Sequence, residues 1–295
     1  MAEIRKVAVL GCGLMGSGIA EVCAKAGYET WVREVNDDLA QKGRGAIEKS
    51  VGRAVDKGKL EDATRTEILG RIHVTTQLSD LSECDLVIEA VTENLEVKSE
   101  MFRELDKLCG EHTIFASNTS SLTIAAMAAA TSRPDRFVGL HFFNPVPVMK
   151  LVEVVRSIAT APAAFRSAFD FAASLGKAPI EAKDTSGFVV NRLLVPYMLD
   201  AIRCLEQGLA SMEDIDKAMT LGTGYPMGPF VLCDFVGIDT LYYISEIMFE
   251  EFREPRFAPP PLLKRMVTLG YYGRKSKKGF YDYTQGDKPV AMTLV

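Results

Sequence analysis

The stretch VAVLGCGLMG, residues 7–16, decides the fold of this chain. Its first four residues are apolar and suited to a buried strand, and a helical pattern follows over residues 18–25. Between them, Gly11, Gly13 and Gly16 form the pattern G-x-G-x-x-G. The first glycine permits a tight turn, the second lets the backbone approach a pyrophosphate, and the third lets the helix pack close to the strand. Because a helix N-terminus also offers unpaired N–H groups to phosphate, the stretch predicts a dinucleotide-binding unit.

The next predicted strand, residues 30–33, ends beside Glu34, about where an acid that binds the cofactor ribose is expected. A carboxylate accepts hydrogen bonds from ribose hydroxyls and repels a 2′-phosphate, so Glu34 favours NAD over NADP. Arg33 weakens this distinction, because an arginine beside the ribose can serve NADP. A solvated charge at a strand end is the alternative interpretation of Glu34. Within the glycine motif, Leu14 and Met15 are also assigned to the cofactor site.

The composition argues against several classes of protein. The 295 residues are 47% hydrophobic and 25% charged, as in an ordinary globular protein of two domains. The net charge of −5 gives no basic footprint for nucleic acid or a membrane surface, and no apolar run is long enough for a transmembrane helix. Six cysteines occur without C-x-x-C pairs or zinc spacing. We therefore predict reduced thiols, no metal site, no nucleic-acid or membrane partner and a cytoplasmic location.

Short apolar runs alternate with helical patterns up to about residue 184. This alternation predicts an α/β fold with a Rossmann-type, doubly wound, mostly parallel sheet. The expected strands are residues 7–10, 30–33, 86–90, 114–117, 137–141 and, after a Pro-rich turn, 150–155.

Beyond residue 184 the pattern is helical throughout. Helices are expected over residues 188–207, from Ser211 onward and over residues 240–252, and no convincing strand appears. We predict a NAD-binding Rossmann domain over residues 1–184 and an all-helical domain for substrate binding and dimerisation over residues 185–295.

Polar residues gather where three of the predicted strands end. Ligands of open parallel sheets bind outside the carboxyl ends of the strands, so such residues indicate a reaction site. They are, in chain order, Thr92, Glu93 and Asn94, then Asn118, Thr119, Ser120 and Ser121, then His141 and Asn144.

His141 is the best candidate for a catalytic base. Its possible partner is Glu153, which lies in the apolar run LVEVV, where burying a carboxylate is costly unless it is paired. If that strand folds back beside His141, Glu153 can accept one imidazole N–H and fix the tautomer. The alternative is that Glu153 is an exposed acid on an edge strand. Ser120 and Asn191 could donate hydrogen bonds to a substrate oxygen, although neither is evidence by itself.

These residues together resemble the L-3-hydroxyacyl-CoA dehydrogenase family, including its short-chain 3-hydroxybutyryl-CoA members. The similarity covers nearly the whole chain. It is carried by GCGLMGSGIA (11–20), DLVIEAVTENLEVK (85–98), IFASNTSSL (114–122), HFFNPVPVMKLVEVV (141–155), KDTSGFVVNRLL (183–194), GYPMGPF (224–230) and GRKSKKGFYDY (273–283).

The resemblance implies NAD-dependent interconversion of 3-hydroxyacyl-CoA and 3-ketoacyl-CoA in a cleft between a Rossmann domain and a helical domain that forms a homodimer. It implies that His141 is the base, that Glu153 orients it, and that Ser120 and Asn191 bind the reacting oxygen. The residues matching the nicotinamide side of the cofactor site are Glu93, Lys98 and Asn144, and Asn118 is assigned to the cofactor site with them.

The same resemblance implies that Ser50 and Lys57 contact coenzyme A. Three residues depart from the family pattern. Cys12 and Leu14 replace residues that are commonly small or hydroxylic, and Glu34 replaces the commoner Asp, which leaves the preference for NAD slightly open.

Two other functions remain as alternatives. A dehydrogenase of free small hydroxy acids has a similar glycine motif but uses a lysine in the helical domain, and no lysine stands out near Asn191. A dinucleotide-binding protein without catalysis is the second, since a fold does not fix a function.

Overall fold

The structure is a computed structural model, and it describes residues 3–284 and 289–294. Residues 1, 2 and 295, at the outer ends of the two predicted domains, lie outside the described part. The chain divides into two compact units, the first ending at Phe188 and the second beginning at Val189. The sequence placed this boundary between residues 184 and 185. The two units are described separately below.

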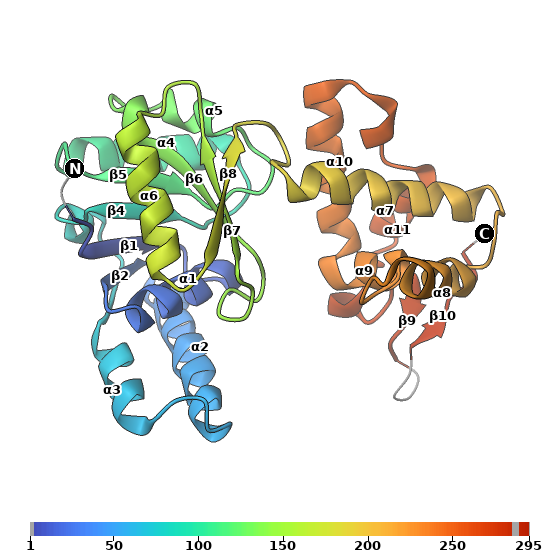
Figure 1. The fold of residues 1–295 in the computed structure, drawn as a ribbon, viewed down its shortest axis with the longest axis horizontal. Coiled ribbons are helices and arrows are strands. Elements are labelled where there is room, and N and C mark those ends of the chain that lie inside the picture. The colour runs from blue at the N-terminus through green and yellow to red at the C-terminus, as the bar shows by residue number, and fades with distance from the viewer. Residues whose placement is uncertain (1–2, 285–288, 295) are drawn as a thin grey trace. The chain divides into compact units, whose positions relative to one another are not determined.

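The first unit is built on one eight-stranded sheet (Figure 1). Its strand order is β3-β2-β1-β4-β5-β6-β7-β8, and every neighbouring pair is parallel except β6 and β7. This is the predicted Rossmann-type, mostly parallel fold. The strands are β1 (Lys6–Leu10), β2 (Glu29–Arg33), β3 (Ile72–Thr75), β4 (Leu86–Glu89), β5 (Ile114–Ser117), β6 (Phe137–Phe142), β7 (Leu151–Arg156) and β8 (Ala178–Lys183).

Helices cover both faces of this sheet because successive side chains of a strand point to opposite faces. On β1, Val7 and Val9 pack in one core with the inward faces of α1, α2 and α6, whereas Ala8 and Leu10 pack in another core with α4 and α5. The helices are α1 (Leu14–Lys25), α2 (Asp37–Asp56), α3 (Asp62–Gly70), α4 (Leu95–Leu108), α5 (Ile124–Ala128) and α6 (Pro162–Ser174).

The sheet changes its direction of winding between β1 and β4, which are neighbours although β2 and β3 lie between them in sequence. Ligands of such sheets bind at this switch point, outside the carboxyl ends of the strands. The glycine motif follows β1 at this point, and the polar residues from the ends of β4, β5 and β6 follow along the same edge.

Two strands of the sheet were missed in the sequence. β3 and β8 are the edge strands, and neither carries a continuous apolar run, because one side of an edge strand is left to solvent. In β3, His73 lies opposite Trp31 of β2.

The second unit is mainly helical, as expected. Ser211 caps its second helix by accepting the backbone N–H of Asp214 on its side chain. Pro196 lies inside the first helix, after which Gly208 takes a left-handed conformation with φ of 66°. The helices are α7 (Val190–Glu206), α8 (Met212–Thr223), α9 (Pro229–Val236), α10 (Ile238–Phe252) and α11 (Pro261–Thr268).

The second unit also contains two short strands, so the expectation of no strand there was wrong. β9 (Tyr281–Asp282) and β10 (Val290–Ala291) pair antiparallel over two residues each, too few for a strand pattern in the sequence. The buried carboxylate of Asp234 fixes the backbone at the start of β9. It accepts the backbone N–H groups of Phe280 and Tyr281 at 2.8 and 2.9 Å and the Tyr283 hydroxyl at 3.0 Å.

Replacing Asp234 with Ala should destabilise the chain by about 2–4 kcal/mol, because two buried N–H groups lose their acceptor. Burial raises the pKa of Asp234 to about 6, so urea unfolding should be measured at pH 8, where the carboxylate is ionised. The control is Asp200→Ala, which removes an exposed ion pair with Arg203 and should change stability by about 0.5 kcal/mol or less. Equal effects of the two substitutions would contradict the role of Asp234.

Candidate active site

His141 and Glu153 face each other across the antiparallel pair β6–β7. The strand register places the two residues directly opposite, and the Nδ1 atom of His141 lies 2.6 Å from the Oε2 atom of Glu153. Glu153 is fully buried and His141 is 6% exposed. Because β7 lies between β6 and β8, the alternative interpretation of Glu153 as an exposed acid on an edge strand is wrong.

The geometry of this pair selects one form of the imidazole. A carboxylate only accepts, so Nδ1 carries the proton of this hydrogen bond, and Nε2 keeps the lone pair that a base needs. Two aromatic rings flank the imidazole, with centroids 4.5 Å away for Phe143 and 5.6 Å for Phe188. The arrangement can therefore take up a proton at Nε2 and compensate the resulting positive charge at Nδ1.

The glycine loop joins β1 to α1, and its three glycines have different surroundings. Gly11 has φ of 86°, in the left-handed region that favours glycine. A Cβ atom on Gly16 would lie 1.8 Å from the carbonyl oxygen of Gly11, whereas one on Gly13 would have no neighbour within 4 Å. The backbone at Gly13 is thus open to a ligand, and α1 begins at the next residue, Leu14, which is 73% exposed.

Glu34 lies at the end of β2 and contacts the glycine loop. Its Oε1 atom accepts the backbone N–H of Cys12 at 2.5 Å, so the carboxylate is held beside the turn. A cavity of about 620 Å³ opens here, large enough for part of a dinucleotide. Its lining includes Gly11, Gly13, Arg33, Glu34, Ala90 and Thr92. Met15, the remaining residue of the motif assigned to the cofactor, is half-buried.

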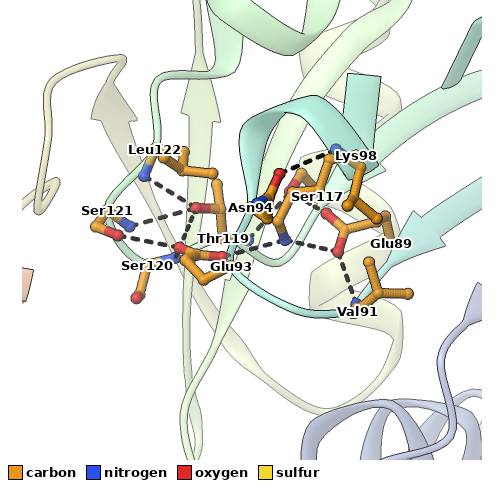
Figure 2. Close-up of polar contacts among 11 residues, drawn as sticks. Glu89, Val91, Glu93, Asn94, Lys98, Ser117, Thr119, Ser120, Ser121 and Leu122 are labelled. Atoms are coloured by element: carbon orange, nitrogen blue, oxygen red, sulfur yellow. Dashed lines mark hydrogen bonds and ion pairs between the residues drawn. The ribbon is translucent and has the colours of Figure 1, made fainter. Parts of the chain in front are cut away.

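Glu93 follows β4, and Lys98 lies in the first turn of α4. Both belong to one connected set of polar contacts (Figure 2). The ammonium of Lys98 lies 3.1 Å from Glu93 and 2.6 Å from Glu89, and Lys98 is 1% exposed. The Oε1 atom of Glu93 accepts the Thr119 hydroxyl at 2.5 Å and the Ser120 backbone N–H at 3.1 Å. The turn after β5, which carries Ser120, is therefore fixed by the residues that follow β4.

The pKa of Glu93 is lowered by these contacts. Burial by itself would raise it, but the positive charge of Lys98 and the hydrogen bonds from Thr119 and Ser120 outweigh that effect. Glu93 is consequently ionised at neutral pH.

The other residues assigned in the sequence occupy different places. The Oδ1 atom of Asn118 accepts the backbone N–H of Phe142 at 2.9 Å, which joins the ends of β5 and β6. Asn144 is exposed in the turn after β6. Ser50 lies in α2 and hydrogen-bonds the buried Glu21, and exposed Lys57 follows the last residue of that helix. Asn191 is the second residue of α7, in the second unit.

Glu89 is the residue of this region that sequence reasoning missed. It is fully buried at the end of β4 and contacts Lys98, Ser117 and Val91. The signal was present, because Glu89 interrupts an apolar run just as Glu153 does. Among the described residues, no cluster of His, Cys, Asp and Glu could hold a metal ion. Within the same residues, no helix combines the length and apolar character of a membrane span.

A glycine loop at the switch point of a parallel sheet, with an acid at the end of β2 and a His–Glu pair at the end of β6, defines a dinucleotide-dependent oxidoreductase. Comparison with known sequences makes the class specific. Residues 6–185 match the family model "3-hydroxyacyl-CoA dehydrogenase, NAD binding domain", and residues 187–283 match "3-hydroxyacyl-CoA dehydrogenase, C-terminal domain". The chain belongs to the 3-hydroxyacyl-CoA dehydrogenase family, which confirms the predicted enzyme class and NAD as the cofactor.

Similar proteins agree with this assignment. The chain is 53% identical over 282 residues to a 3-hydroxybutyryl-CoA dehydrogenase of Mycobacterium tuberculosis, covering 95% of this chain and 99% of the relative. It is 48% identical to the mitochondrial hydroxyacyl-coenzyme A dehydrogenase of Homo sapiens, with coverage of 95% and 91%. The crystal structure of an (S)-3-hydroxybutyryl-CoA dehydrogenase from Ralstonia eutropha superposes with a TM-score of 0.93 at 43% identity, covering 96% and 100%.

Two glycine substitutions should separate folding from cofactor binding. Gly16→Ala should lower the free energy of unfolding by about 2 kcal/mol or more, because its Cβ would overlap the Gly11 carbonyl. Gly13→Ala should leave the fold intact and weaken NADH binding at least about tenfold, because the methyl group would occupy the approach to the pyrophosphate. Thermal unfolding and NADH fluorescence titration test the pair; unchanged NADH affinity in Gly13→Ala would contradict the assignment of this loop.

Proposed function

We propose that this enzyme oxidises (S)-3-hydroxyacyl-CoA, and preferentially the short-chain 3-hydroxybutyryl thioester, with His141 as the general base. The observation that supports the base is the 2.6 Å contact between buried Glu153 and the Nδ1 atom of His141. The chain length and stereochemistry follow the named relatives of M. tuberculosis and R. eutropha.

NAD+, when bound, would supply the acceptor for the hydride on the 3-carbon. The Nε2 atom of His141 takes the proton of the 3-hydroxyl group as the C–H bond breaks, and the carbonyl group forms. The carboxylate of Glu153, which contacts Nδ1, offsets the charge on the imidazolium. In the reverse reaction the imidazolium returns the proton to the oxygen.

The reacting oxygen needs hydrogen-bond donors. We assign Ser120 to this role because it follows β5 at the same edge of the sheet as His141 and because its backbone is fixed by Glu93. Asn191, in the second unit, is the second donor that the resemblance implies. Glu93, Lys98, Asn118 and Asn144 are assigned to the nicotinamide half of the cofactor on the same basis, with the glycine loop and Glu34 for the other half.

The coenzyme A part of the substrate carries phosphates, so an enzyme with a net charge of −5 needs local positive charge to bind it. We assign Ser50 and Lys57 to this contact. Lys57 is exposed at the C-terminal end of α2, where its ammonium can reach a phosphate.

We further infer a homodimer formed through the second unit and a cytoplasmic location. Large apolar side chains are exposed in the second unit, among them Leu193 of α7 at 71% and Leu221 of α8 at 77%, which a partner subunit could cover. The location is supported by the six cysteines, all of which are free thiols.

The substrate class is tested by following NADH oxidation with acetoacetyl-CoA and with free acetoacetate at equal concentrations. Turnover should occur with the thioester and be at least about a hundredfold lower with the free acid, because the coenzyme A contacts supply binding energy. NADPH in place of NADH should also lower turnover, since Glu34 repels a 2′-phosphate. Comparable rates on the free acid would instead support the hydroxy-acid dehydrogenase, and NADH binding without turnover would support a non-catalytic protein.

Substitution of the His–Glu pair tests the mechanism. His141→Gln should lower kcat by about 10²–10⁴-fold while NADH affinity is preserved, because only the proton acceptor is lost. Glu153→Gln should lower kcat at least about tenfold, since an amide N–H facing Nδ1 favours the tautomer with the proton on Nε2. The matched control is His112→Gln, an exposed histidine before β5, which should retain full activity. Full activity of His141→Gln would remove this residue from the mechanism.

A further inference from the structure

Three charged side chains meet at the carboxyl end of β4 and have no part in the proton transfer proposed above. They are Glu89, Lys98 and Glu93 (Figure 2). Glu89 and Lys98 are 0% and 1% exposed, so water screens neither charge, and 34% of the Glu93 side chain is exposed. Burying such a group of charges costs free energy, so a functional role is a reasonable explanation for its presence.

The hydrogen bonds around Glu89 satisfy both carboxylate oxygens. Oε1 accepts the Lys98 ammonium at 2.6 Å and the backbone N–H of Val91 at 2.7 Å, and Oε2 accepts the Ser117 hydroxyl at 2.6 Å. Because one of the three donors is a cation, that hydrogen bond is charge-assisted. Glu89 therefore anchors the ammonium of Lys98 from the side of the strand, and Lys98 in turn lies 3.1 Å from Glu93.

The charges of the three side chains do not sum to zero. Two carboxylates and one ammonium leave a net charge of −1, held within one connected set of hydrogen bonds and ion pairs. In a site of low dielectric constant a fixed charge of this kind acts on a ligand charge more strongly than a solvated one does.

The position of this charge relative to the cofactor follows from the sheet. The glycine loop after β1 and Glu34 after β2 bind the adenine-nucleotide half of the dinucleotide, so the nicotinamide half crosses the switch point toward the ends of β4 and β5. The cluster lies at those two strand ends, and Glu93 hydrogen-bonds the turn that carries Ser120. This placement rests on the function proposed above.

We propose that Glu89 is a positioning residue that anchors Lys98, and that the net negative charge of the Glu89–Lys98–Glu93 cluster stabilises oxidised NAD+ relative to NADH in the site. The nicotinamide ring is positively charged in NAD+ and becomes neutral when it accepts a hydride. A fixed negative charge nearby therefore lowers the free energy of the oxidised cofactor and leaves that of the reduced cofactor almost unchanged. The cluster thus adjusts the equilibrium between the two bound forms without touching the substrate.

The test is Glu89→Gln, with dissociation constants for NAD+ and NADH measured by direct binding without acyl-CoA. Glutamine keeps the shape of the side chain, and its oxygen can still accept from Val91 and Lys98, while the Ser117 hydroxyl can rotate to accept the new N–H. The charge of the cluster becomes zero. The ratio Kd(NAD+)/Kd(NADH) should rise by about threefold or more relative to the unsubstituted enzyme.

Two further variants distinguish charge from structure. Glu83→Gln makes the same charge change just before β4, at the opposite end of that strand and in an exposed ion pair with Lys6, and should leave the ratio unchanged. Glu93→Gln removes a charge of the cluster at its partly exposed position and should raise the ratio as Glu89→Gln does, which also covers a failure of Glu89→Gln to fold.

An equal change in both dissociation constants, or none, in the cluster variants would overturn the proposal and leave the proposed function intact. If the unsubstituted enzyme bound both cofactors and the cluster variants shifted the ratio as expected, but the unsubstituted enzyme did not reduce acetoacetyl-CoA, the proposed substrate would be wrong and this inference would stand.

Discussion

The hydrogen bond between His141 and Glu153 is the interaction on which the account of this enzyme depends. It exists because β7 runs antiparallel to β6 in a sheet whose other neighbouring strands are parallel. The reversal places residues twelve positions apart directly opposite each other, at the end of the sheet where ligands bind. β8 pairs with the far side of β7, so Glu153 lies in an interior strand. Its side chain is fully buried, so the carboxylate has little water to compete with the imidazole.

The same arrangement, a buried carboxylate with a defined partner, occurs twice at the active-site edge of the sheet. A carboxylate is set into an apolar strand and is paired with a defined hydrogen-bond donor, which is the imidazole for Glu153 and the ammonium for Glu89. An unpaired charge at either place would be strongly unfavourable, so each partner is held in one geometry. The rigid sheet thereby fixes both the proton acceptor, His141, and the electrostatic field of the Glu89–Lys98–Glu93 cluster. The glycine loop at the same edge provides the open backbone that phosphates require.

Much of this architecture could be predicted from the sequence. The five early apolar runs correspond to β1, β2, β4, β5 and β6, because strands covered on both faces carry continuous apolar residues. The edge strands β3 and β8 could not be recognised, since partly exposed strands lack that pattern. The two-residue strands β9 and β10 are too short to leave any pattern.

The active site could be predicted less completely than the fold. Glu153 was recognised as a candidate partner, but the sequence could not decide whether β7 was an interior strand, because that depends on the undetected β8. Glu89 likewise interrupts an apolar run, LVIE, but it could not be identified as functional because the sequence shows no histidine near it as a partner. The roles of Ser50, Lys57 and Asn191 rest on the resemblance, because their side chains belong to elements whose spacing alone implies no ligand.

The protonation of His141 tests the central claim most directly. Nitrogen-15 NMR of the imidazole at neutral pH, assigned by comparison with His141→Gln, reports which ring nitrogen carries hydrogen. The proposed mechanism requires a proton on Nδ1, shared in a short hydrogen bond with Glu153, and an unprotonated Nε2. A proton on Nε2 with a bare Nδ1 would contradict it, because the nitrogen that must accept the hydroxyl proton would already be occupied.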